Sequence, residues 1–288
     1  MRAARIILVM TATPALIVAF FAVLVYGAGI DNRYTRSINE NLYFLPAAMV
    51  SGKFVFFGEV EREMRMYQNA VNFQSKGAVI DYPKERASIL DNLIDQKIVN
   101  DLVSRKKIGV ENQELDEYYS HLSATFETRE IVKIFAVSEE EFKRIIVRPD
   151  LQSMKLRAAL YAQSTDSKEY QRVIKIKQLI DDGLDFSEAV RSYSEDEDTK
   201  YISGDLGFKT AGELGPWLSP AVVALQSSST SEVIVSPEGY HILRVASRDS
   251  NAVPEEIDVQ HLLIRGFDFE RYLEEQRKNY RIYTFMRD

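Results

Sequence analysis

Apolar residues recur at helical spacing through the first half of this 288-residue chain, after a hydrophobic stretch at its start. A three-to-four-residue spacing, typical of a helix with one buried face, follows the β-prone run Lys53–Phe57. The same spacing continues in helices expected to begin at Pro83 and at about Asn112. Ser138 and Glu141 have the separation of a helix capping box. These stripes predict a module of helices with a common core.

The last third of the chain contains short runs of β-prone residues instead. Val233–Val235 and Tyr240–Val245 flank the letters SPEG, a composition typical of a β-hairpin. Ile257–Arg265 is a further β-rich run, whereas Leu156–Ala162 has the composition of a helix. The pattern as a whole therefore predicts an α+β fold with a small antiparallel sheet.

The amino-terminal segment 6–29 contains no charged side chain and is long enough to cross a bilayer as a helix. Arg2 and Arg5 precede it, which favours a cytoplasmic N-terminus and places the remainder outside the cytoplasm. The alternative is a cleaved signal peptide, but its apolar core would be shorter, about 7–15 residues. We expect a single-pass anchor in the cell membrane, with the main domain on the periplasmic or cell-surface side.

Composition excludes several classes of function. The formal net charge of −7 and the lack of a long basic run argue against nucleic acid as a partner. Cysteine is absent, so thiolate metal sites and a cysteine nucleophile are excluded. The three histidines, His121, His241 and His261, lack the spacing of a zinc motif. We therefore expect neither a metal nor a cofactor.

A first resemblance covers roughly Met49–Tyr119. The letters SGKFVFFGEVEREM and ILDNLIDQKIVNDLVSRKKIGVENQELDEYY resemble the amino-terminal chaperone domain of the SurA/PrsA/PpiD class of bacterial foldases. In that class, a short strand and three helices lead into a parvulin domain.

A second and more specific resemblance covers Gly183–Val245. The letters DFSEAVRSYSED, GDLGF, GELGPWLSPAVVAL and SEVIVSPEGYHILRV occur in the order found in parvulins. The resemblance implies a peptidyl-prolyl cis-trans isomerase that works without a cofactor or a covalent intermediate.

The parvulin resemblance also implies residues that bind the substrate proline. Leu206, Leu214 and Leu218 fall where parvulins place the side chains of the proline pocket. Leu218 stands where the family usually has phenylalanine, and Trp217 beside it is a candidate replacement.

Two polar residues carry catalytic expectations from the same resemblance. Asp196 falls at a position that is cysteine in some parvulins and aspartate in others, although it also fits a solvated acidic loop. His241 matches the second of the two central histidines, the alternative being a buried histidine that only stabilises the core.

The first parvulin histidine is missing from its usual place. Leu156–Ala162 occupies that place and contains no histidine, whereas Ile257–Arg265 resembles the missing strand and carries His261. We therefore predict a circularly permuted parvulin-like domain whose HLLI strand comes from the C-terminal end, with His261 as the third catalytic candidate. The alternative is that the first histidine is lost and His261 belongs to an unrelated strand.

These inferences define six segments. We expect a cytoplasmic N-terminus (1–5), an anchor (6–29), a linker (30–46), a SurA-like chaperone module (47–155), a parvulin-like domain (156–266) and a C-terminal helix and strand (267–288). In this class the tail returns to the amino-terminal module, so we expect Ile282–Phe285 to pair with Lys53–Phe57.

Three functions fit the sequence. The first is an isomerase and chaperone for unfolded or proline-containing exported polypeptides, anchored to the bilayer through residues 6–29. The second is a catalytically weak or inactive parvulin-fold chaperone that only binds clients. The third is a structural membrane protein that organises partners. An oligomer is compatible with all three.

Overall fold

The computed structural model describes residues 45–75, 78–125 and 128–286, which form two compact units. Unit 1 contains the described residues up to Ile98, Lys133–Ala136 and the described residues from Glu275 onward. Unit 2 contains Val99–Val132 and Val137–Glu274. The predicted anchor, residues 6–29, lies outside the described residues.

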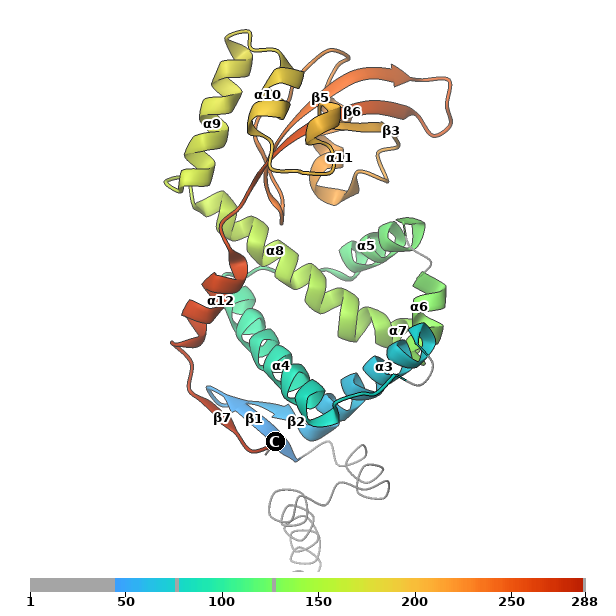
Figure 1. Cartoon of the computed structure of the whole chain (residues 1–288), viewed down its shortest axis with the longest axis vertical. Helices are drawn as coiled ribbons and strands as arrows, with labels where there is room; N and C mark the ends of the chain where they lie inside the picture. The colour runs from blue at the N-terminus through green and yellow to red at the C-terminus, as the bar shows by residue number, and fades with distance from the viewer. Residues whose placement is uncertain (1–44, 76–77, 126–127, 287–288) are drawn as a thin grey trace, which may run out of the picture. The chain divides into compact units, whose positions relative to one another are not determined.

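A small three-stranded sheet organises unit 1. Strands β1 (Pro46–Val50) and β2 (Lys53–Phe56) form a hairpin, and β7 (Ile282–Thr284) pairs antiparallel with the other edge of β1. Figure 1 shows the blue hairpin beside the red C-terminal strand. The unit also contains α3 (Phe57–Gln74) and most of α4 (Tyr82–Arg105).

The position of β7 corrects one expectation and refines another. The tail does return to the amino-terminal module, but Ile282 pairs with Val50 of β1 rather than with the Lys53–Phe57 run. The pairing prediction was wrong because Pro46–Val50 was not recognised as a strand. Its letters PAAMV contain two alanines and a proline, which are poor signals for a strand.

The helical part of unit 2 begins with the end of α4. It continues through α5 (Asn112–Thr125), most of α6 (Thr128–Phe135), α7 (Glu139–Phe142), the π-helical turn η2 (Lys143–Val147) and α8 (Arg148–Gln163). Ser138 caps α7 as predicted, because its hydroxyl accepts a hydrogen bond from the Glu141 backbone N–H at 3.1 Å. Helix α8 includes Leu156–Ala162, which confirms the helical prediction for that segment.

The remainder of unit 2 is a four-stranded antiparallel sheet with helices. In chain order the elements are α9 (Lys168–Asp181), α10 (Phe186–Tyr193), η3 (Lys200–Ile202), β3 (Asp205–Lys209), α11 (Gly215–Ala224), β4 (Ile234–Val235), β5 (Gly239–Asp249), β6 (Glu256–Arg265) and most of α12 (Phe269–Arg277). The strand order is β3-β6-β5-β4, so the late strand β6 lies in the centre of the sheet (Figure 1).

Alternate residues of β5 and β6 supply two separate cores. Tyr240, Ile242, Leu262 and Ile264 point to one face and pack with buried residues of α9 and α10. Leu243, Val245, Ile257 and Val259 point to the other face and pack with Val222 of α11. Because both faces are covered in the middle of the sheet, Gly239–Leu243 and His261–Ile264 are buried without interruption.

Within residues 45–75, 78–125 and 128–286, no helix combines the length and the apolar character that a membrane crossing requires.

The edge position of β7 generates a test of unit 1. Phe285 N donates to Ala47 O, and Ser51 N donates to Arg281 O, both at 2.9 Å. Deleting residues 282–288 should therefore accelerate amide hydrogen exchange in β1 while leaving β5 and β6 protected. The substitution Tyr283→Thr is the matched control, because it removes an exposed side chain and keeps the backbone bonds. Equal protection of β1 with and without β7 would contradict this assignment.

Candidate active site

Two histidines lie on adjacent central strands and point to the same face of the sheet. His241 of β5 is paired with Leu263, and His261 of β6 is paired with Leu243, so the histidines are diagonal neighbours. Their ring centroids are 5.9 Å apart with an interplanar angle of 27°. Both are buried, with exposed fractions of 1% for His241 and 7% for His261. The fold therefore brings together two of the three residues that the sequence predicts to be catalytic.

The third predicted residue, Asp196, binds His261 directly. Asp196 Oδ2 lies 2.7 Å from His261 Nε2, and Thr199 Oγ1 lies 2.9 Å from the same nitrogen. The Thr199 hydroxyl also donates to Asp196 Oδ2. Burial alone would raise the pKa of Asp196, but the hydrogen bonds from Thr199 and His261 outweigh it, and the pKa is lowered. Asp196 is therefore an ionised partner of His261 rather than part of a solvated loop.

The charge of Asp196 fixes how His261 is protonated. An ionised carboxylate can only accept hydrogen bonds, so His261 must carry a proton on Nε2. In the neutral ring, Nδ1 is then an acceptor, and this atom is buried without a hydrogen-bond partner among the described atoms. The second ring nitrogen of His261 is therefore left without a hydrogen-bond partner inside the site.

Backbone bonds hold the loop of Asp196 against β6. Glu195 N donates to Leu263 O at 2.8 Å, and Leu263 N donates to the buried Ser194 hydroxyl at 3.2 Å. Farther along, His261 N donates to Gly204 O at 2.8 Å. Gly204 has φ +74°, and a Cβ at this position would lie 2.1 Å from the His261 carbonyl oxygen. The glycine therefore permits the close approach that places Asp196 at His261.

His241 is paired with a hydroxyl rather than with a charge. Its Nε2 lies 2.8 Å from Ser236 Oγ, which also accepts a hydrogen bond from Glu238 N at 3.0 Å. Burial first, and then the neighbouring His261, lower the pKa of His241 to about 3 against the opposing effect of Asp196. His241 is therefore neutral at physiological pH.

The predicted proline-binding residues divide between two places. Leu206, Leu214 and Leu218 are partly buried and pack against the same core as Leu243 and Val259, on the face of the sheet that carries the histidines. Trp217 instead lines a separate cavity with residues of α5 and α8. The structure brings the three leucines together but does not bring Trp217 to them.

Sequence reasoning missed two hydroxyl groups, Thr199 and Ser236, which contact the two imidazole rings. Ser236 belongs to the predicted hairpin, in which Ile234 lies opposite His241. A hairpin drawn from the sequence with this pairing would have placed Ser236 close to His241. Thr199 had no such signal, because its position depends on the irregular loop between α10 and β3.

This arrangement combines an apolar surface with a row of neutral and charged hydrogen-bonding groups. The Ser236 hydroxyl contacts the His241 ring, and the Thr199 hydroxyl contacts both the His261 ring and the Asp196 carboxylate, so both hydroxyls belong to this row. Among the residues that the structure describes, no three His, Asp or Glu side chains are grouped to hold a metal ion.

Comparison with protein families identifies the class. Residues 1–173 match the SurA-like N-terminal domain, and the chain belongs to that family. Residues 154–247 match the PPIC-type PPIASE domain, the parvulin family of prolyl isomerases. Both sequence resemblances are thereby confirmed. The second match ends before β6, so His261 lies outside it.

Individual relatives carry foldase names. The chain is 27% identical over 184 residues to foldase protein PrsA of Caldanaerobacter subterraneus, covering 57% of each protein. It is 36% identical over 86 residues to chaperone SurA of Methylobacillus flagellatus, covering 30% of this chain and 20% of that one. The chain thus spans less than two thirds of these relatives.

Solved structures were also matched. The crystal structure of PrsA from Bacillus subtilis is 17% identical, covers 78% of this chain and 80% of its own, and has a TM-score of 0.25. A TM-score this low supports no conclusion about the site.

The lowered pKa of His241 predicts how unit 2 responds to acid. The folded-state pKa of about 3 lies below the unfolded value of 6.5, so the stabilising contribution is complete above pH 6.5 and is lost as the pH falls toward 3. Between pH 7 and 4.5 the loss should be on the order of 2 kcal/mol. Urea unfolding followed by the fluorescence of Trp217, the single tryptophan, would measure it.

The variant His241→Asn should lack this acid-dependent loss. Comparing variant and parent is necessary because Glu63 in unit 1, whose pKa burial raises to about 7, changes stability in the opposite direction over the same pH range. An identical pH dependence in parent and variant would show that His241 is not held neutral by the fold.

Proposed function

We propose that this chain is an extracytoplasmic folding factor that catalyses cis/trans isomerisation of X-Pro bonds in exported polypeptides. The observation that carries the proposal is the set of polar groups around His241 and His261 beside the leucine surface. This set lies in the part of the chain that matches, or directly follows, the PPIC-type PPIASE domain. The foldase names of the relatives support the same function.

The proposed reaction needs little chemistry from the protein. The barrier to rotation about an X-Pro bond is about 20 kcal/mol and reflects amide resonance, so a catalyst must favour the twisted amide over the planar one. In the proposal, Leu206, Leu214 and Leu218 hold the proline ring. His241 and His261 provide hydrogen bonds whose strength changes as the amide twists, and Asp196 orients His261.

The position of β6 supports the proposed circular permutation. β6 lies between β3 and β5, but it follows the segment that matches the PPIASE domain. Directly after β6, a Cβ on Gly266 would lie 2.2 Å from the Tyr161 ring, and Tyr161 Oη donates to Phe267 O at 3.0 Å. The end of β6 therefore lies beside the end of α8, a few residues before α9 begins, which is where a strand preceding α9 would finish.

The wider organisation is proposed on the same basis. Residues 47–155 form the chaperone module that holds unfolded clients, residues 156–266 form the isomerase domain, and residues 267–288 return to the first module. Residues 6–29 anchor the chain in the membrane with the N-terminus in the cytoplasm, as their uncharged sequence favours.

A second candidate function is a client-binding scaffold with weak or absent catalysis. Leu218 in place of an aromatic residue reduces the apolar area offered to a proline ring, and His261 is supplied from outside the matched domain. Measured isomerase activity separates the two candidates.

The isomerase proposal predicts the effect of changing Asp196. Exchange of a short X-Pro peptide, measured by NMR with the full chain, should be accelerated by the parent. Asp196→Asn weakens a charge-assisted hydrogen bond worth about 1.5–3 kcal/mol, so the acceleration should fall roughly 10- to 100-fold. The control Glu197→Gln changes a neighbouring exposed acid and should retain activity. A folded parent that does not accelerate exchange would favour the scaffold.

The permutation predicts that the isomerase domain tolerates its strands in another order. A chain in which residues 256–266 directly precede residues 164–249 should fold, with the amide exchange protection of β5 and β6 retained. A shuffled version of residues 256–266 in the same place is the matched control and should not fold. Failure of both chains to protect β5 would argue that β6 depends on its present connections.

A further inference from the structure

A cavity of about 600 Å³ lies within unit 2, on the other side of the segment that carries the leucines. Its walls come from α5, from α8 and from the segment 210–219. Leu151, Tyr118, Pro216 and Trp217 contribute apolar surface, and Trp217 is the single tryptophan of the sequence. No role in the proposed isomerisation has been assigned to this space.

The two sides of the segment 210–219 face different surroundings. Leu214 and Leu218 pack onto the core of the sheet, whereas Gly215, Pro216 and Trp217 line the cavity. A contact with α5 holds the segment in place, since His121 Nδ1 lies 2.7 Å from Gly212 O. A group bound in the cavity would therefore touch the same short segment as a proline bound on the leucines.

The charges around the cavity are unbalanced. Three carboxylates line it, those of Glu114, Glu117 and Glu213, against the single ammonium of Lys155, which is paired with Glu114 at 2.7 Å. Glu213 accepts hydrogen bonds from the backbone N–H and hydroxyl of Thr210, which lower its pKa and keep it ionised. Glu117 accepts from the neutral Gln113 amide at 2.9 Å.

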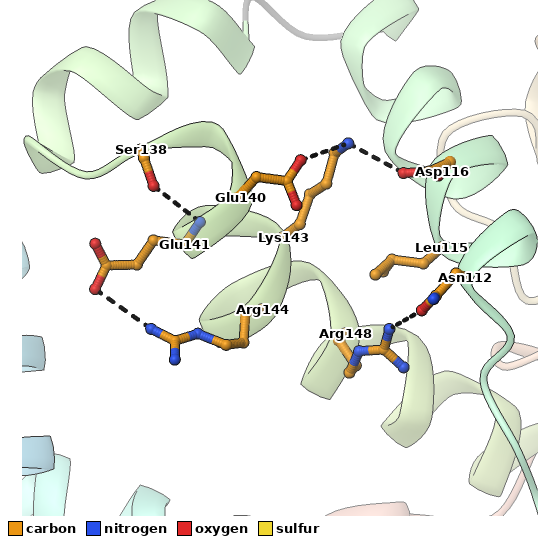
Figure 2. A pocket seen from close by; sticks show the side chains of 9 residues that line it. All are labelled: Asn112, Leu115, Asp116, Ser138, Glu140, Glu141, Lys143, Arg144 and Arg148. Carbon is orange, nitrogen blue, oxygen red and sulfur yellow. Dashed lines mark hydrogen bonds and ion pairs between the residues drawn. The ribbon is translucent and has the colours of Figure 1, made fainter.

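A second cavity in the same unit provides a contrast. Figure 2 shows Lys143 between Asp116 and Glu140, Arg144 beside Glu141, and Arg148 bonded to Asn112. Leu115 is the one apolar side chain among the residues that line it. This second cavity is therefore close to neutral and polar, and it offers little to an apolar ligand.

We propose that the cavity of Trp217 is an accessory site for the client chain, which takes a large apolar side chain next to a lysine or arginine. The apolar walls bury the first residue. The cation is attracted by the carboxylates of Glu117 and Glu213 and by the face of the indole ring. That the ligand is a client polypeptide rests on the proposed function. The kind of side chains that the site binds is inferred from the cavity alone.

The single tryptophan allows a direct test. Two capped, proline-free hexapeptides would be titrated into the full chain, one with phenylalanine followed by lysine and the other with glutamate in place of that lysine. The lysine peptide should change the Trp217 emission in a saturable manner, and the glutamate peptide should bind at least about fivefold more weakly. Higher salt should reduce the difference between the two peptides.

Two variants that each remove an exposed carboxylate test whether the charge of the cavity attracts the lysine. Glu117→Gln removes a carboxylate at the cavity and should reduce the affinity for the lysine peptide about threefold or more. Glu140→Gln removes another exposed carboxylate, at the second cavity, and should leave the affinity unchanged. Equal affinity for both peptides, or equal effects of the two variants, would overturn the proposal.

The remaining outcomes separate this inference from the isomerase proposal. An active isomerase whose Trp217 emission does not respond to either peptide has no accessory site, and the isomerase proposal stands. Specific binding of the lysine peptide by an inactive protein supports the site and removes the isomerase function. Emission that depends on protein concentration without peptide would mean that a second copy fills the cavity, and the proposal would fail.

Discussion

The antiparallel pairing of β5 with β6 determines both cores and the position of the site in unit 2. The pairing runs from Gly239 opposite Arg265 to Asp249 opposite Glu256, with one irregularity after Val245. Because side chains alternate along a strand, this register sends Tyr240 and Ile242 to one core and His241 and Leu243 to the other. A shift of one residue would turn the histidines toward α9 and α10, and no site would form.

The site also shows how burial and charge assign different states to two residues of one type. His241 is buried and meets a hydroxyl, and its burial keeps it neutral. His261, on the neighbouring strand, meets an ionised carboxylate that fixes its proton on Nε2. In the proposed isomerisation, a neutral ring beside an oriented ring would suit an amide that changes its polarity during rotation, since neither group would have to be desolvated at that moment.

Local sequence patterns were sufficient for much of this structure. The helical stripes, the SPEG hairpin and the strand at Ile257–Arg265 were all predicted, because each depends on the spacing of nearby residues. Features that depend on distant contacts were missed or wrong. Ala47 and Ala48 are buried in a strand whose composition does not suggest one, and the partner of β7 could not be chosen without that strand. Thr199 reaches His261 only through an irregular loop, and Trp217 turned to the opposite side of its segment from Leu218.

The sheet of unit 1 joins parts of the chain that are made at very different times. Ser51 and Arg281 are hydrogen-bonded although 230 residues separate them. During synthesis, β1 therefore has one open edge until residues 282–284 emerge, and the whole of unit 2 can form before that edge is covered. An open edge is a template for pairing with any extended chain. A nascent copy of this protein is consequently exposed to unwanted strand pairing at β1 until β7 is in place.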